Sequence, residues 1–100
     1  MTSNPGPTIP GSPSRILLVD DHPIVLEGLV ARLEEEPDLS VCGTAADAYA
    51  AMDAIGKLNP DLVVTDLSLG TKPGLELIKD ITKAHPELPT LVLSIHDETL

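Results

Sequence analysis

Oxygen-bearing side chains directly follow three short apolar runs of this chain. Asp20 and Asp21 come after residues 16–19, Asp66 after residues 62–65, and Ser94 after residues 90–93. Ionised carboxylates that gather at one place repel one another, by roughly 4 kcal/mol per pair at about 4 Å and an effective dielectric constant of about 20. A hard, octahedral cation such as Mg²⁺ relieves that repulsion and suits an all-oxygen ligand set, and it shares its shell with a phosphate.

Asp66 stands alone after its apolar run, where an exposed nucleophilic carboxylate can sit. Carboxylates form aspartyl phosphates in covalent catalysis. A metal ion neutralises incoming phosphoryl oxygens, and the Ser94 hydroxyl can donate a hydrogen bond to one of them. These residue types therefore predict phosphoryl chemistry at Asp66, provided that the fold brings the three segments together.

The three apolar runs have the pattern of buried parallel strands. Each is short, continuous and rich in branched residues, as in strands that are covered on both faces. Residues 39–43 form a weaker, half-polar run that is typical of an edge strand. In open sheets of this kind, ligands bind beyond the carboxyl ends of the strands, near the point where the strand order reverses. The carboxylates and Ser94 are therefore expected to converge at one edge of a sheet.

Segments with helical spacing alternate with these runs. The first opens at His22-Pro23, since proline suits the first helical position, the second has Asp47 as its N-cap, and the third begins near Pro73-Gly74. Apolar residues at helical spacing are expected to face the core; they are Leu26, Leu29, Val30 and Leu33, then Ala48, Ala51, Met52 and Ile55, then Leu77, Ile78, Ile81 and Ala84. The order βαβαβαβ predicts an α/β fold, a doubly wound parallel sheet with helices on both faces.

The composition fits one small globular domain of 100 residues with a net charge of −10. That charge opposes phosphate backbones and anionic lipid, so we expect neither nucleic acid nor a membrane as a direct partner of this chain. Cys42 is the only cysteine, which excludes a disulfide framework and fits a cytoplasmic location. Residues 1–14, rich in Pro, Gly, Ser and Thr, are expected to form a flexible leader before the domain at residues 15–100.

Three segments resemble the hallmark stretches of response-regulator receiver domains. They are residues 18–23 (LVDDHP), 61–66 (DLVVTD) and 91–94 (LVLS). The stretches DDHPIVLEGL and LSIHDE are similar to the NarL/FixJ-type branch of these two-component signalling proteins. The resemblance covers residues 15–100.

The resemblance implies a flavodoxin-like (CheY-like) sheet of strand order 2-1-3-4-5. It implies that Asp20, Asp21, Asp66 and the backbone carbonyl of Ser68 hold Mg²⁺, and that Asp66 accepts a phosphoryl group from a sensor histidine kinase. Ser94 matches the switch hydroxyl that moves toward the phosphoryl group and biases the following segment between two states. The output in this branch is usually a C-terminal DNA-binding domain, so the resemblance implies transcription regulation and no enzymatic activity of the receiver itself.

Two departures from the family pattern stand out. The family usually has Pro four residues after the phosphoacceptor and then Asp-Gly, with the Gly four residues beyond that Pro, where this chain has Gly70 and Pro73-Gly74. The family's fifth strand, with its Lys, and the final helix are absent because the sequence stops at Leu100. We therefore expect a C-terminally truncated receiver that lacks roughly 20 to 25 residues, judged from ordinary element lengths. Homodimerisation stays open, since the family often uses the surface from the fourth helix onward.

Other functions are weighed against this one. A stand-alone receiver or adaptor would act through protein contacts without a DNA-binding domain. A Mg²⁺-dependent phosphohydrolase with an aspartyl nucleophile commonly has a second Asp two residues later, where this chain has Ser68. A flavin or nucleotide binder would need a Gly-rich loop after the first strand, where residues 20–23 read DDHP.

Several polar residues also have simpler interpretations. Asp21 can act partly as a helix N-cap, and His22 is interpreted as a loop or capping histidine because the site already has its ligands. His85 is placed at a helix end and His96 on the surface. The run Glu34-Glu35-Glu36 is expected to be a solvated helix end.

Overall fold

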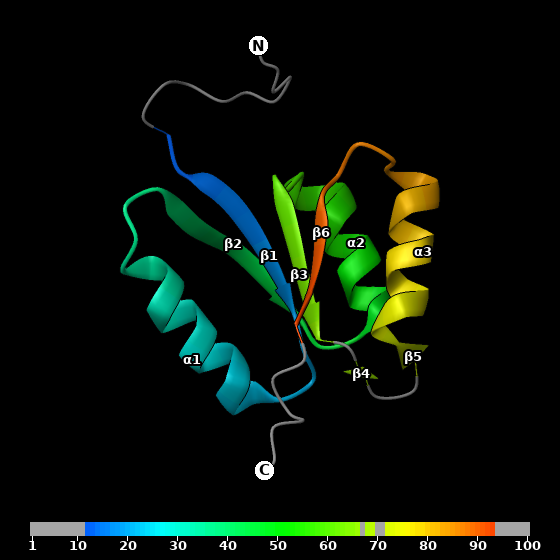
Figure 1. The fold of residues 1–100 in the computed structure, drawn as a ribbon, viewed down its shortest axis with the longest axis horizontal. Coiled ribbons are helices and arrows are strands. Elements are labelled where there is room, and N and C mark those ends of the chain that lie inside the picture. The colour runs from blue at the N-terminus through cyan, green and yellow to red at the C-terminus, as the bar shows by residue number, and fades with distance from the viewer. Residues whose placement is uncertain (1–11, 67, 70–71, 94–100) are drawn as a thin grey trace.

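The computed structural model describes residues 12–66, 68–69 and 72–93, which form a parallel sheet with helices packed on it (Figure 1). In chain order the elements are β1 (Ser14–Val19), α1 (Pro23–Glu34), β2 (Leu39–Ala45), α2 (Ala48–Leu58), β3 (Leu62–Asp66), β4 (Ser68–Leu69), β5 (Lys72–Pro73), α3 (Gly74–Ala84) and β6 (Thr90–Leu93). The four longer strands are parallel and lie in the order β2-β1-β3-β6. The predicted doubly wound α/β sheet is confirmed, and these strands take the first four places of the implied order.

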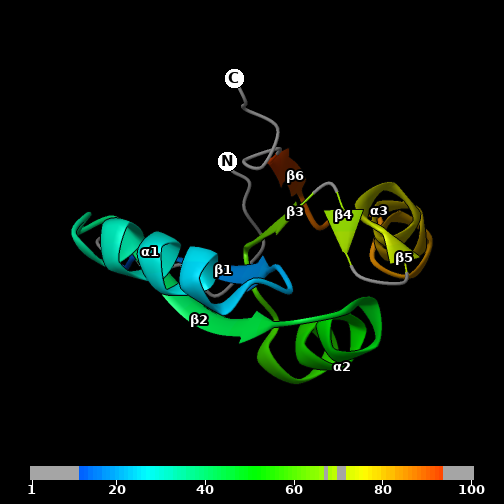
Figure 2. The same cartoon turned by 90° about the horizontal axis from the view of Figure 1, so that it is seen from below.

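Successive side chains of a strand point to opposite faces, so β1 supplies both layers of the core. Leu17 and Val19 pack with buried residues of α2 and α3, whereas Ile16 and Leu18 pack on the side of α1. Figure 2 shows α1 on one side of the sheet and α2 and α3 on the other. We call these sides the one-helix face and the two-helix face.

Hydrogen bonds hold both ends of α2. The Asp47 side chain accepts from the Ala50 N–H at 2.7 Å, which confirms Asp47 as the N-cap. At the other end Arg15 Nη1 donates to the carbonyls of Leu58 at 2.6 Å and Asn59 at 3.0 Å. Asn59 ends the helix in the left-handed conformation with φ 49°. Arg15 therefore ties the start of β1 to the carboxyl end of α2.

The structure differs from the sequence-based expectations at several points. Ala84 is exposed because it is the last residue of α3, and Leu91 is half-exposed because no second described strand pairs along β6. The expected burial of residues 90–93 on both faces was therefore wrong for the described part of the chain. Glu34 is exposed, as expected of a helix end, yet its side chain also accepts a hydrogen bond from the Val41 N–H at 2.9 Å.

The structure also differs from the expectation at the start of β1 and in the segment after β3. β1 begins at Ser14, inside the expected leader, most of which lies outside the described residues. After β3, the strands β4 and β5 form an antiparallel pair, Ser68 with Pro73 and Leu69 with Lys72, which the sequence did not indicate. Among the described residues no helix is both long and apolar enough to cross a membrane.

Candidate functional site

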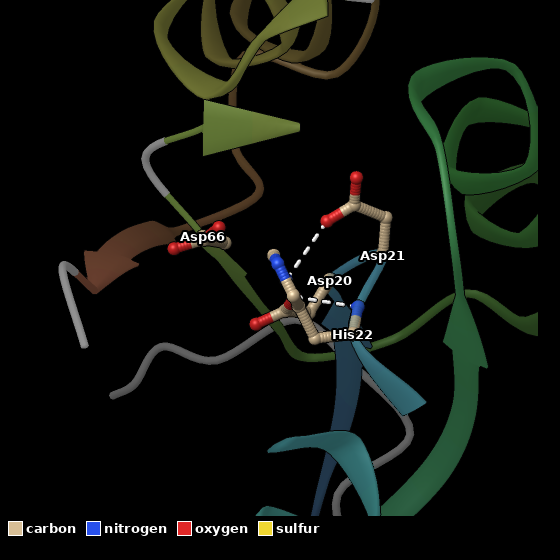
Figure 3. Close-up of side chains that lie close together, drawn as sticks. All are labelled: Asp20, Asp21, His22 and Asp66. Carbon is tan, nitrogen blue, oxygen red and sulfur yellow. Dashed lines mark hydrogen bonds and ion pairs between the residues drawn. The ribbon is translucent and has the colours of Figure 1, made fainter. Parts of the chain in front are cut away.

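The pairing of β1 with β3 brings the predicted carboxylates together. Val19 is paired with Thr65, so Asp20 and Asp66 come next at the same level of the sheet. The potential ligand atoms of Asp20, Asp21, His22 and Asp66 all lie within 4.8 Å of one another (Figure 3). The convergence that the strand pattern predicts is therefore present for three carboxylates, and an imidazole lies with them.

Asp20 and Asp66 are almost completely buried, with 2% and 3% of their surface exposed. The Asp20 N–H donates to the carbonyl of Ala45 at 3.0 Å, which continues the pairing of β1 and β2. Beside Asp66, the buried Thr65 hydroxyl donates to the Asp66 carbonyl at 3.1 Å. Burial lowers the effective dielectric constant, so repulsion between these carboxylates is stronger than it would be in water. The site therefore favours a positively charged occupant.

His22 is the residue of this group that sequence reasoning left out of the predicted ligands. It occupies the N-cap position of α1 but makes no side-chain capping hydrogen bond. Instead its Nδ1 lies 2.7 Å from Asp20 Oδ1 and 2.9 Å from Asp21 Oδ1. Its backbone N–H also donates to Asp20 Oδ1 at 2.9 Å. The available signal was a histidine two residues after a strand-end acid and directly before the proline that begins a helix.

These contacts change the acid–base behaviour of His22. The hydrogen bond to Asp20 is the main cause that raises the pKa of His22 above its ordinary value of 6.5. Partial desolvation lowers this pKa, while the charges of Asp21, Asp20 and Asp66 raise it further. The neighbouring carboxylates therefore favour the imidazolium form of His22.

The geometry and donor types fit a divalent cation. An octahedral ion with bonds of about 2.1 Å places neighbouring ligand atoms about 3.0 Å apart and opposite ones about 4.2 Å apart. The donor atoms of this group lie within 4.8 Å of one another, so small shifts bring them to those separations. The carboxylates of Asp20, Asp21 and Asp66 are hard oxygen donors of the kind that Mg²⁺ prefers.

Other predicted residues are placed as follows. Ser68 begins β4, two residues after Asp66, and the role of its carbonyl stays a prediction. Ser94 and His96 lie outside the described residues. His85 is the C-cap residue of α3, at the end of that helix away from the site (Figure 1).

Comparison with known proteins identifies the family. The sequence pattern of the response regulator receiver domain matches residues 16–100. The chain belongs to this receiver family. Its relatives include the transcriptional regulatory protein DegU of Brevibacillus brevis, 33% identical over 84 residues that make up 84% of this chain and 36% of DegU. A protein-glutamate methylesterase/protein-glutamine glutaminase of Rhizobium etli is 37% identical over 83 residues, 83% of this chain and 24% of that protein.

Solved structures agree with this membership. A LuxR-family two-component response regulator from Aurantimonas sp. superposes with a TM-score of 0.81 and 38% sequence identity, covering 86% of this chain and 61% of that one. Together with DegU, it supports the NarL/FixJ-type branch of the receiver family. The receiver spans about a third or less of the length of the two curated relatives.

Proposed function

We propose that this chain is the phosphoacceptor receiver of a two-component response regulator, and that Asp66 accepts a phosphoryl group from a sensor histidine kinase. The observation that carries the proposal is the convergence of Asp20, Asp21 and Asp66 within 4.8 Å at the ends of β1 and β3. Membership of the receiver family supports the same assignment.

In the proposed step, a carboxylate oxygen of Asp66 forms a bond to phosphorus while the bond from phosphorus to the donor nitrogen breaks. The donor imidazole leaves with that electron pair and takes up a proton from solvent, and Asp66 becomes an acyl phosphate. The ionised form of Asp66 is the nucleophile. Its place at the end of β3, opposite the end of β1, holds it in one position relative to Asp20.

Asp20, Asp21, Asp66 and the carbonyl of Ser68 are the proposed ligands of Mg²⁺. When bound, the ion supplies positive charge that neutralises the phosphoryl oxygens. The Ser94 hydroxyl is proposed to donate a hydrogen bond to one of those oxygens. That contact would bias the segment after β6 between two states, which is how receivers of this kind are switched.

The proposed output is control of transcription in the cytoplasm through a DNA-binding domain outside residues 15–100. The name of DegU and the LuxR-family description of the Aurantimonas structure support this output. The Rhizobium etli relative is named as an enzyme, but this chain matches only 24% of its length. We therefore assign no enzymatic reaction to the receiver, and we propose the residues before Ser14, where β1 begins, as its leader.

The test is the intact mass of the protein after incubation with acetyl phosphate and Mg²⁺. Wild type is expected to gain one phosphoryl group, and Asp66→Asn to gain none. Asp53→Asn is the matched control, since Asp53 is exposed on α2 and forms an ion pair with Lys57 at 3.1 Å. A chelator should abolish the gain in wild type. No gain in folded wild type, or an equal gain in Asp66→Asn, would contradict the proposal.

A further inference from the structure

We propose that His22 is itself a ligand of the cation site, through Nδ1, and that it shifts the site's preference toward divalent ions that accept nitrogen ligands. The inference rests on the proposed function, because it adds a residue of this chain to the proposed Mg²⁺ site. It concerns which ion the site selects.

The first support is the position of the imidazole. Nδ1 lies 2.7 Å from Asp20 Oδ1 and 2.9 Å from Asp21 Oδ1. Neighbouring ligand atoms on an octahedral ion are about 3.0 Å apart, so Nδ1 is spaced from both carboxylates as an adjacent ligand would be. Figure 3 shows the His22 side chain directed into the group formed by the three carboxylates.

The second support is the way in which the backbone holds His22. Its extended conformation, φ −112° and ψ 103°, immediately precedes Pro23 at the first position of α1. Its N–H is also bound to Asp20 Oδ1 at 2.9 Å. An N-cap side chain ordinarily accepts a hydrogen bond from the first turn of its helix. The side chain of His22 is directed into the site instead, so its placement serves the carboxylates and not α1.

The chemistry follows from the identity of the donor. An imidazole nitrogen ligates through its lone pair, so Nδ1 would hold a cation in its unprotonated form, with any proton on it released to solvent. Imidazole suits first-row transition ions such as Co²⁺, Ni²⁺ and Zn²⁺, whereas Mg²⁺ favours oxygen. An Asp₃His set therefore discriminates between these two classes more strongly than three carboxylates do.

The test measures Mg²⁺ and Co²⁺ affinities by calorimetry for wild type, His22→Gln and His85→Gln. We expect His22→Gln to lower Co²⁺ affinity by about tenfold or more, in the range found when groups that support a metal site are removed, and to change Mg²⁺ affinity by less than about threefold. His85→Gln, at the far end of α3, should leave both affinities unchanged. In ¹⁵N-histidine NMR spectra, Zn²⁺ should shift the Nδ1 resonance of His22, and Mg²⁺ should not.

Several outcomes would overturn the inference. An equal loss for both ions would mean that His22 acts only by orienting Asp20, and an unchanged Co²⁺ affinity would mean that Nδ1 does not ligate. Failure of folded wild type to bind either ion at millimolar concentration would also contradict it. The mass assay on Asp66 separates the two proposals. Phosphorylation with no effect of His22→Gln on Co²⁺ binding would remove the inference alone, whereas selective Co²⁺ loss without phosphorylation would remove the proposed function alone.

Discussion

The two faces of the sheet are covered to different degrees. On the two-helix face, Leu17, Val63, Leu77 and Ile81 are fully buried between the sheet and its helices. On the one-helix face, the buried residues Ile16, Leu18 and Val64 all belong to strands, and α1 contains no buried residue. The apolar side chains of α1 are only partly covered. Among the described elements, the two-helix face therefore forms the denser part of the core.

The helix ends show the same difference. α2 is held by Asp47 at its start and by Arg15 at its end. α1 starts at His22 without a side-chain cap, because that side chain contacts Asp20 and Asp21. The connection from β1 into α1 thus gives up a local stabilising interaction, typically worth about 1 kcal/mol, at the place where the site is built. Among the described residues, the buried helix side chains lie on the two-helix face, and the candidate site lies at the start of α1.

The largest expected effect comes from truncating a fully buried side chain of the two-helix face. Leu77 is 0% exposed, so Leu77→Ala removes buried methyl groups and leaves a cavity. We expect the free energy of unfolding to fall by about 3 kcal/mol, measured by urea denaturation. Ile55→Val, which removes one buried methylene, should cost only about 1 kcal/mol and keeps the test informative if the larger truncation prevents folding.

The matching truncation on the one-helix face should cost much less. Leu29 of α1 is partly buried and packs on the cluster of Ile16, Leu18 and Val64. We expect Leu29→Ala to lower the free energy of unfolding by about 1 kcal/mol, because less apolar surface returns to water. A loss as large as that of Leu77→Ala would show that the two faces are equally well packed, which would contradict the difference in packing between them.

Much of this arrangement could be predicted from local sequence patterns. Short branched runs at residues 16–19 and 62–65 predict parallel strands, and the acids that follow them must then meet at one edge. The proline and acid before α1 and α2 predict where these helices begin, and the structure confirms Pro23 and Asp47 in those roles. The hydrophobic period of a strand or helix and the residues at its ends depend only on neighbours a few positions away. They can therefore be interpreted without knowledge of the fold.

What the sequence could not indicate depends on contacts between distant segments. The β4–β5 pair has only two residues in each strand, too few for any period to appear. Leu91 belongs to an apolar run like that of β3, and it is half-exposed because no further described strand pairs along β6. His22 has a local interpretation as a cap, but its direction is set by where β1 places Asp20. The carboxylates of the site were predicted and the imidazole's part in it was not.

A smaller effect is expected at the start of α2. Asp47→Ala removes the acceptor for the Ala50 N–H, and we expect it to lower the free energy of unfolding by about 1 kcal/mol. Asp53→Ala on the same helix is the control, since it removes only an exposed pair with Lys57, which is worth about 0.5 kcal/mol or less. Thermal unfolding measures both variants. Equal losses of stability in Asp47→Ala and Asp53→Ala would mean that the Asp47 cap adds no stability that α1 lacks.

The smallest expected effect is the pH dependence that His22 contributes. Its pKa is raised in the folded chain, chiefly by Asp20, so folding favours the protonated imidazole. This stabilisation is fully present below the unfolded-state pKa of about 6.5 and is lost as the pH rises through the higher folded-state pKa. With a chelator present, wild type should therefore lose stability relative to His22→Gln as the pH rises from about 6 through the folded-state pKa of His22. NMR titration of His22 should show its pKa above 6.5, and Asp20→Asn should lower it. A His22 pKa at or below 6.5 would mean that the carboxylates do not favour the imidazolium form of His22, and the start of α1 would then lack the feature that sets it apart from α2.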